Sequence, residues 1–240
     1  MSASAAALLA GARAVGFDLD GTLIDSAPDL AAAANTALRT VGLAPLPEAK
    51  ITDFIGEGMD RLIDAAVQAS AGGVPDESRR EAARAAFRRS YGAQPFARSR
   101  VYPGVRTALR ALQARRLSLC CLTNKPGEFA EALLVAAGLR SLFALVLTPA
   151  AAAERKPSPL LLQRACAQLA IAPAELVYVG DSSLDVQAAR AAGCPVVGVS
   201  YGYHTAQLQA AGPDALLDSL LELAGRTFHD AADEARRLLG

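Results

Sequence analysis

Two acidic residues, Asp18 and Asp20, stand two positions apart directly after a short apolar run that ends at Phe17. Carboxylates so close together repel each other, so a bound cation or a retained proton must offset the repulsion. A Mg²⁺ ion held by one or two carboxylates, waters and a phosphate is the expected solution. Gly21 then permits a tight turn. A Ca²⁺-binding loop is the alternative, but the Glu that such a loop carries at its twelfth position is missing, since Asp29 stands there, so we favour the magnesium site.

A second acidic pair, Asp181 and Asp185, follows the apolar run 176–179. The spacing of four residues places both side chains on one face of an opening helix. Like charges at that spacing destabilise a bare helix, which indicates a cation between or near them. The alternative is that the two acids only interact with the N-terminal end of the helix dipole.

Two further polar segments each follow an apolar run. Thr123 and Asn124 offer a hydroxyl and backbone N–H groups at a strand-to-helix junction, which together make an anion-binding cradle. Lys156 stands beside Pro157, which restricts the lysine backbone, and a lysine there can neutralise a phosphate or a carboxylate as a point charge. Taken singly, the first segment could be ordinary turn and N-cap chemistry, and the second a solvated basic loop.

The elements that must position these residues are short apolar runs without alternation, the pattern of strands buried on both faces of a parallel sheet. The expected strands are 14–17, 117–122, 143–147, 176–179 and 195–199. Helical stretches lie between them at 105–115, 127–137, 159–169 and 184–192. This alternation predicts a doubly wound α/β fold with a parallel sheet. Ligands bind at the carboxyl ends of the strands in such folds, and all four motifs stand there.

The first two expected strands are far apart, because one ends at residue 17 and the next begins at residue 117. A simple crossover needs only about a dozen residues. The residues between them carry helical periodicity and predict a small α-helical cap domain inserted after the first strand. We place this cap at 26–99 and a discontinuous catalytic core at 1–25 and 100–240. The apolar start, 1–10, is expected to be a frayed extension of the core.

Composition narrows the function classes. The 24 basic and 24 acidic residues balance to zero net charge, which argues against a nucleic-acid partner. No apolar run reaches the roughly 20 residues needed to span a bilayer, so no membrane partner is expected. The four cysteines show no metal-binding spacing, which is typical of reduced cysteines in a cytoplasmic protein. This charge balance is compatible with a small anionic substrate that binds at a local charged site. The protein is expected to be a monomer or a homodimer.

Taken together, the four motifs resemble the haloacid dehalogenase superfamily of phosphotransferases, which use an aspartate nucleophile. The residues that carry the resemblance are Asp18-Leu19-Asp20-Gly21-Thr22, Thr123-Asn124, Lys156-Pro157 and Gly180-Asp181 with Asp185. The resemblance covers essentially the whole chain and implies Mg²⁺ as the cofactor. It implies that Asp18 attacks phosphorus and forms an aspartyl-phosphate. Asp20 would act first as general acid and then as general base.

The same resemblance implies roles for the other site residues. Four residues would bind the phosphoryl group: Thr123, Asn124, Lys156 and Gly21. Thr123 and Lys156 also count among the catalytic residues, since Lys156 would stabilise charge on the phosphate and on Asp18. Asp181 would ligate the metal together with Asp18 and the main-chain carbonyl of Asp20. Asp185 would support the metal ligands from behind or through water.

A finer resemblance points to the phosphoglycolate phosphatases. The matching segments are 23–30, 55–58, 123–126, 155–161, 179–195 and 201–203. Two departures stand out, because His204 replaces a common Asn and Thr148-Pro149-Ala150 replaces a Gly-Gly-Asp. The resemblance implies Mg²⁺-dependent hydrolysis of 2-phosphoglycolate, a small anionic phosphomonoester, to glycolate and phosphate. A phosphatase of broader or different specificity, acting on sugar phosphates, is the alternative.

Two other functions and two residues stay open. A receiver-like signalling module also uses an acidic pocket, a Thr and a Lys, but such modules are much shorter and carry no cap. A β-phosphoglucomutase-like phosphotransferase would need a polar, sugar-binding set in the cap, which the sequence does not show. Arg61 could assist substrate binding near the turn 55–58 or be an ordinary exposed residue. His204 could line the rim of the site or be a plain loop residue.

Overall fold

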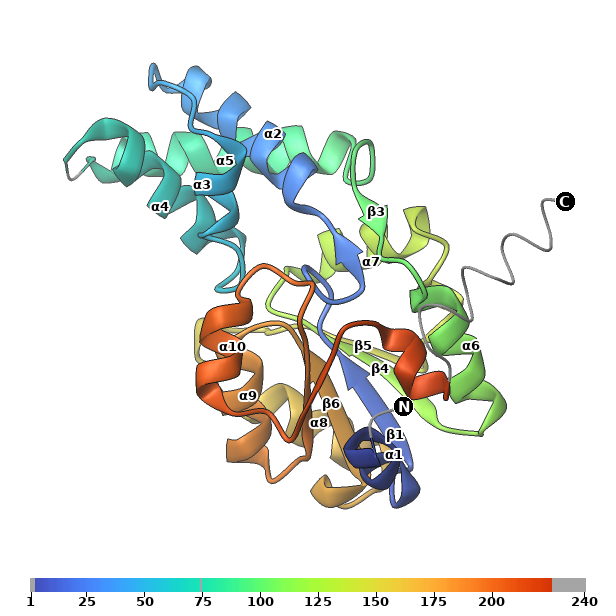
Figure 1. The fold of residues 1–240 in the computed structure, drawn as a ribbon. Coiled ribbons are helices and arrows are strands. Elements are labelled where there is room, and N and C mark those ends of the chain that lie inside the picture. The colour runs from blue at the N-terminus through green and yellow to red at the C-terminus, as the bar shows by residue number, and fades with distance from the viewer. Residues whose placement is uncertain (1–2, 74, 226–240) are drawn as a thin grey trace, which may run out of the picture.

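The computed structural model describes residues 3–73 and 75–225. At its centre lies a sheet of six strands in the order β5-β4-β1-β6-β7-β8, and every neighbouring pair is parallel (Figure 1). The strands are β1 (Ala14–Phe17), β4 (Ser118–Leu122), β5 (Leu145–Leu147), β6 (Leu176–Gly180), β7 (Val196–Val199) and β8 (Ala215–Leu217). The first strand in the chain is therefore central, with β4 on one side and β6 on the other.

Both faces of the sheet are buried, as the unbroken apolar runs require. Successive side chains of a strand point to opposite faces. In β1, Val15 and Phe17 join one hydrophobic cluster, whereas Ala14 joins a second cluster with Leu122 and Tyr178. The sheet thus has an apolar layer on each side, and the predicted doubly wound α/β fold is confirmed.

Helices cover both layers (Figure 1). On the Phe17 side lie α1 (Ala3–Ala10), α6 (Val105–Ala114) and α7 (Gly127–Ala136). On the other side lie α8 (Leu160–Leu169), α9 (Ser183–Ala192) and α10 (Thr205–Ala211). Short 3₁₀ turns complete the connections at Arg140–Leu142, Ala152–Glu154, Pro173–Glu175 and Leu220–Ala224. None of the described helices is long and apolar enough to cross a membrane.

Two features of this layer arrangement differ from the sequence expectations. The N-terminal residues expected to be a frayed extension form α1 instead, and its Leu9 is buried in the Phe17 cluster. Strand β8 is absent from the expected set, because three residues are too short a run to be recognised. The outer ends of the expected core, residues 1–2 and 226–240, lie outside the described residues.

Four helices form a separate group beyond the carboxyl edge of the sheet: α2 (Ala27–Thr40), α3 (Glu48–Thr52), α4 (Met59–Ala71) and α5 (Glu77–Ala93) (Figure 1). Their apolar faces share a hydrophobic cluster that contains Leu38 and Phe87, and Phe129 of α7 joins it from the sheet side. Helix α5 begins after Asp76, whose side chain accepts a hydrogen bond from the Arg79 N–H. A helical group inserted after the first strand agrees with the predicted fold class, while the exact boundaries 26–99 stay a prediction.

The chain passes between the sheet and the inserted helices at two adjacent points. Strand β2 (Ile24–Asp25) pairs antiparallel with β3 (Arg100–Val101), and Asp25 stands opposite Arg100. Next to this ribbon, the buried Asp29 accepts hydrogen bonds from the backbone N–H groups of Arg98 (3.0 Å) and Ser99 (2.8 Å). The segment that leads into the inserted helices is therefore hydrogen-bonded to the segment that leads back to the sheet.

Candidate active site

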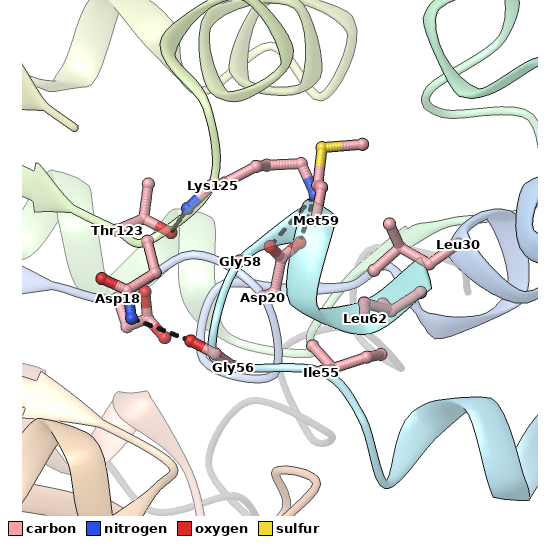
Figure 2. A pocket seen from close by; sticks show the side chains of 11 residues that line it. Asp18, Asp20, Leu30, Ile55, Gly56, Gly58, Met59, Leu62, Thr123 and Lys125 are labelled. Atoms are coloured by element: carbon pink, nitrogen blue, oxygen red, sulfur yellow. Dashed lines mark hydrogen bonds and ion pairs between the residues drawn. The ribbon is translucent and has the colours of Figure 1, made fainter. Parts of the chain in front are cut away.

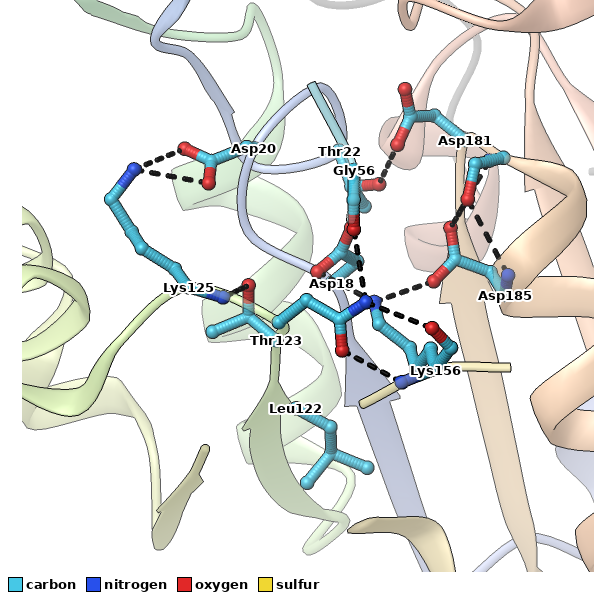
Figure 3. A network of polar contacts seen from close by, with 12 residues as sticks. Asp18, Asp20, Thr22, Gly56, Leu122, Thr123, Lys125, Lys156, Asp181 and Asp185 are labelled. Atoms are coloured by element: carbon cyan, nitrogen blue, oxygen red, sulfur yellow. Dashed lines mark hydrogen bonds and ion pairs between the residues drawn. The ribbon is translucent and has the colours of Figure 1, made fainter. Parts of the chain in front are cut away.

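The four polar motifs meet at the carboxyl edge of the sheet (Figure 3). Asp18 directly follows β1, Thr123 follows β4 and Asp181 follows β6. Lys156 lies in the loop after β5, and its side chain reaches Asp18. Because β1 is flanked by β4 and β6, Asp18 stands in the middle of the group, where open α/β sheets bind ligands.

Three acids gather at this edge. Asp18, Asp181 and Asp185 each offer a carboxylate oxygen within 4.8 Å of the others, and all three residues are buried. Oδ1 of Asp18 forms an ion pair with Nζ of Lys156 at 2.8 Å. Three buried carboxylates are hard oxygen donors of the kind that bind divalent cations, and without a cation they repel one another. The residues present could therefore hold a divalent metal ion.

The crowding of acids changes their titration. Burial is the largest effect on Asp18 and raises its pKa to about 6, although Lys156 lowers it. Burial, followed by the charges of Asp185 and Asp18, raises the pKa of Asp181 well above its ordinary value. Both carboxyl groups therefore resist ionisation unless a cation compensates the charge.

The turn after β1 packs tightly against Asp181. Gly21 has a φ of +83°, in the left-handed region that favours glycine, and a Cβ there would stand 2.3 Å from Oδ2 of Asp181. The Thr22 hydroxyl donates to Oδ1 at 3.3 Å, and the backbone N–H of Tyr203 donates to Oδ2 at 2.9 Å. The structure thus places Gly21 beside the acidic group, where only glycine fits.

Lys156 is buried between two of the acids. Its Nζ lies 2.8 Å from Oδ1 of Asp18 and 2.6 Å from Oδ1 of Asp185, and it donates to the Tyr178 hydroxyl at 2.9 Å. Burial lowers the pKa of Lys156, but the charges of Asp18 and Asp185 outweigh this effect and raise it. Asp185 also accepts hydrogen bonds from the hydroxyl and the backbone N–H of Ser182. This acid is therefore surrounded by protein donors.

The side chain of Asn124 is already engaged. Its Nδ2 donates to the carbonyl oxygens of Gly56 (2.9 Å) and Lys156 (3.1 Å), and its Oδ1 accepts from the Lys156 N–H at 2.7 Å. Both donors of the amide are used in this way. Gly56 belongs to the inserted helical group, so Asn124 ties that group to the sheet edge, and its backbone is what it can offer to a ligand.

Asp20 lies apart from the three clustered acids and faces a second lysine (Figure 3). Lys125 Nζ donates to both carboxylate oxygens of Asp20, at 2.9 and 3.0 Å, and the Ser26 hydroxyl donates to Oδ1. Burial lowers the pKa of Lys125, but the charge of Asp20 outweighs this effect and raises it. Sequence reasoning missed Lys125 as a site residue, although its place directly after the Thr123-Asn124 motif was a signal.

A pocket lies between this polar edge and the inserted helices (Figure 2). Its polar lining consists of Asp18, Asp20, Thr123, Asn124 and Lys125. The rest of its lining comes from the inserted helical group: Leu30, Ile55, Gly56, Gly58, Met59 and Leu62. A small pocket with a charged floor and apolar walls can enclose a small anionic ester and exclude water from it.

Comparison with known proteins identifies the family. The profile of the haloacid dehalogenase-like hydrolases matches residues 15–199. The chain belongs to this family. A phosphoglycolate phosphatase of Nitrosospira multiformis is 41% identical over 211 residues, which are 88% of this chain and 93% of the relative. One of Vibrio vulnificus strain YJ016 is 38% identical over 214 residues, 88% of this chain and 94% of the relative.

A solved structure supports the same assignment. The crystal structure of a predicted phosphoglycolate phosphatase from Haemophilus somnus has a TM-score of 0.85 and 35% sequence identity, and the match covers 89% of this chain and 96% of that one. The expected superfamily, fold class and enzyme class, a phosphoric monoester hydrolase, are thereby confirmed. A receiver-like signalling module is not supported, because the hydrolase family profile spans most of the chain.

The contacts of two residues that the sequence left open, His204 and Arg61, are now defined. His204 Nε2 lies 2.8 Å from the carbonyl oxygen of Ile55, so it contacts the inserted helical group. Arg61 is exposed and lines a different hollow together with Asp53 and Glu57. Arg61 is not among the residues that line the pocket above Asp18.

Proposed function

We propose that this hydrolase cleaves 2-phosphoglycolate to glycolate and phosphate, with Mg²⁺ and through an aspartyl-phosphate intermediate. The observation that carries the proposal is the place of Asp18, which lines a small pocket, pairs with Lys156 and clusters with two other buried acids. The substrate is suggested by the relatives of Nitrosospira multiformis and Vibrio vulnificus, which are named phosphoglycolate phosphatases.

Asp18 and Asp181, with the main-chain carbonyl of Asp20, would hold the Mg²⁺ ion. When bound, the ion supplies positive charge to these carboxylates and to the phosphate oxygens. We assign Asp185 a supporting role, because Lys156 and Ser182 already donate to its oxygens. Such partners fix the orientation of metal ligands and of the lysine.

The reaction proceeds in two displacements. An oxygen of Asp18 attacks phosphorus, the bond between phosphorus and the ester oxygen breaks, and protonated Asp20 gives its proton to the leaving glycolate oxygen. Asp20 then removes a proton from a water molecule whose oxygen attacks the phosphorus, which releases phosphate and restores the Asp18 carboxylate. Lys156 stabilises negative charge on Asp18 and on the phosphoryl group in both displacements.

The remaining assignments concern binding and organisation. The Thr123 hydroxyl, the Asn124 backbone and the turn at Gly21 would hold the phosphoryl oxygens. In this proposal, 26–99 is a cap that closes the pocket, and 1–25 with 100–240 is the catalytic core. The enzyme would act in the cytoplasm on a small anionic phosphomonoester, as a monomer or a homodimer, without a nucleic-acid or membrane partner.

The test is phosphate release from 2-phosphoglycolate with Mg²⁺ and with a chelator, beside a panel of glucose and ribose phosphates. We expect metal-dependent turnover with the highest kcat/KM for 2-phosphoglycolate. Faster hydrolysis of the sugar phosphates would contradict the assignment of 2-phosphoglycolate and favour a phosphatase of broader or different specificity. Asp20→Asn should lower kcat by about 10²- to 10⁴-fold, and an Asp18→Asn enzyme with full turnover would contradict the covalent mechanism.

A further inference from the structure

Among the described residues, Lys125 is the only cation that lines the pocket above Asp18. Its side chain has no exposed surface, and Nζ donates to both oxygens of Asp20. The two displacements of the proposed reaction use Asp20 but give Lys125 no task. Burying even a paired charge carries a desolvation cost, so the place of Lys125 in the pocket needs a reason.

The apolar part of the pocket could not accept a second anionic group. Leu30, Met59 and Leu62 surround the space beside Asp20 (Figure 2). Burying an unpaired carboxylate among such side chains is strongly unfavourable. Lys156 does not supply a counter-charge there, because its Nζ pairs with Asp18 and Asp185 at the other end of the site. A substrate with a carboxylate near its phosphate ester therefore needs a counter-charge at the Asp20 end.

Lys125 has the capacity to provide that charge. An ammonium group has three N–H donors, and Nζ directs hydrogen bonds to the two oxygens of Asp20. The Tyr91 ring lies with its centroid 4.7 Å from Nζ and favours a cation there. A lysine is a compact charge on a flexible stem. It can therefore turn from one carboxylate to another within the pocket.

We propose that Lys125 is a specificity-determining residue whose ammonium receives the carboxylate of the substrate. The pocket would thereby select small phosphomonoesters that carry a carboxylate on the carbon next to the ester oxygen. In the free enzyme, the Lys125 ammonium binds the Asp20 carboxylate instead of the carboxylate of the substrate. The inference rests on the proposed function, because it explains how 2-phosphoglycolate is distinguished from uncharged esters.

The test compares 2-phosphoglycolate with ethyl phosphate, which has the same carbon frame without the carboxylate. The measured quantity is the ratio of the two kcat/KM values. Lys125→Met should lower this ratio about 100-fold, mainly through the KM for 2-phosphoglycolate. The substitution also deprives Asp20 of its lysine partner, but this effect lowers kcat/KM for both esters equally and therefore cancels in the ratio. Lys125→Arg keeps a cation and should keep most of the preference.

Two cations outside the pocket are matched controls. Arg61 is exposed, and Nη2 of Arg155 lies 3.7 Å from Oδ2 of Asp60. Arg61→Met and Arg155→Met should leave the ratio unchanged. A selective loss of 2-phosphoglycolate turnover in either of them, together with an unchanged ratio in Lys125→Met, would overturn the proposal.

If the Lys125→Met protein fails to fold or is inactive on both esters, further variants test the same proposal. Lys125→Gln can still donate to Asp20 and should lower the same ratio. Calorimetric binding of both esters to Asp18→Asn, with and without Lys125→Gln, reads the preference without turnover. A wild-type enzyme with no preference for 2-phosphoglycolate would contradict the proposed function itself. A preference that survives the loss of the Lys125 charge would contradict this inference alone.

Discussion

The backbone N–H of Tyr203 donates a 2.9 Å hydrogen bond to Oδ2 of Asp181. The hydroxyl of the same tyrosine accepts hydrogen bonds from the backbone N–H groups of Ser26 (2.8 Å) and Ala27 (3.0 Å) and donates to Asp25. One residue therefore connects the acidic group with the point where the chain enters the inserted helices.

Tyr203→Phe separates these two connections. The backbone contact with Asp181 remains, whereas the buried N–H groups of Ser26 and Ala27 lose their acceptor. We expect the free energy of unfolding to fall by about 1–3 kcal/mol, measured by urea denaturation, with unchanged Mg²⁺ affinity in a calorimetric titration. Weakened Mg²⁺ binding at unchanged stability would show that the hydroxyl contacts do not fasten the crossing.

Asn124→Ala should loosen the inserted helices from the sheet edge. The substitution removes the hydrogen bonds to Gly56 and Lys156, so we expect a loss of about 1–3 kcal/mol in the free energy of unfolding and a higher KM for 2-phosphoglycolate. Asn35 is a matched control, because its amide makes an equivalent pair of bonds with Leu46 inside the helical group. Asn35→Ala should lower stability and leave KM unchanged. Equal KM values in both variants would argue against a tie between the two parts.

Lys156→Met should be strongly destabilising as well as inactive. It leaves Asp18 and Asp185 buried without their cation, and breaking a buried pair in this way costs about 3–5 kcal/mol. Lys50→Met removes a lysine from an exposed pair with Asp53, so it should change stability by less than about 0.5 kcal/mol. Denaturation of both variants in the absence of metal checks the difference. Similar stabilities would show that the buried lysine does not compensate the acids.

The stability of the metal-free protein should depend on pH through Asp18 and Asp181. Both pKa values are raised in the folded state, so the folded protein holds protons that the unfolded chain has already released. The free energy of unfolding should therefore fall as pH rises from about 4, the ordinary carboxyl pKa, through the Asp18 pKa of about 6.

Mg²⁺ should reverse this loss, because it binds the ionised carboxylates. We expect the ion to raise the melting temperature more at about pH 8 than at about pH 5. Asp181→Asn, which removes one charge from the group, should reduce the Mg²⁺-induced shift. A shift that is equally large at both pH values would mean that the ion binds elsewhere.

Much of the fold and part of the site could be predicted from sequence for one physical reason. Parallel strands end at the same edge of a sheet, so Asp18, Thr123 and Asp181, each placed directly after an apolar run, had to converge. The pairing of Lys125 with Asp20 joins the loops after β4 and β1, and the Asn124 amide joins the loop after β4 to Lys156 and to Gly56 of the inserted helices. Contacts of this kind join residues that no local spacing relates, so sequence reasoning could not find them.

The pairing of Asp25 with Arg100 in the β2–β3 ribbon also bears on how the protein could have diversified. The two ends of the helical insert lie side by side, so the insert joins the rest of the chain through a connection no wider than a β-hairpin. A lineage could exchange the helices for another insert, or shorten them to a turn, without changing the register of any strand. Substrate choice could thus have changed repeatedly while the aspartate-bearing edge stayed the same.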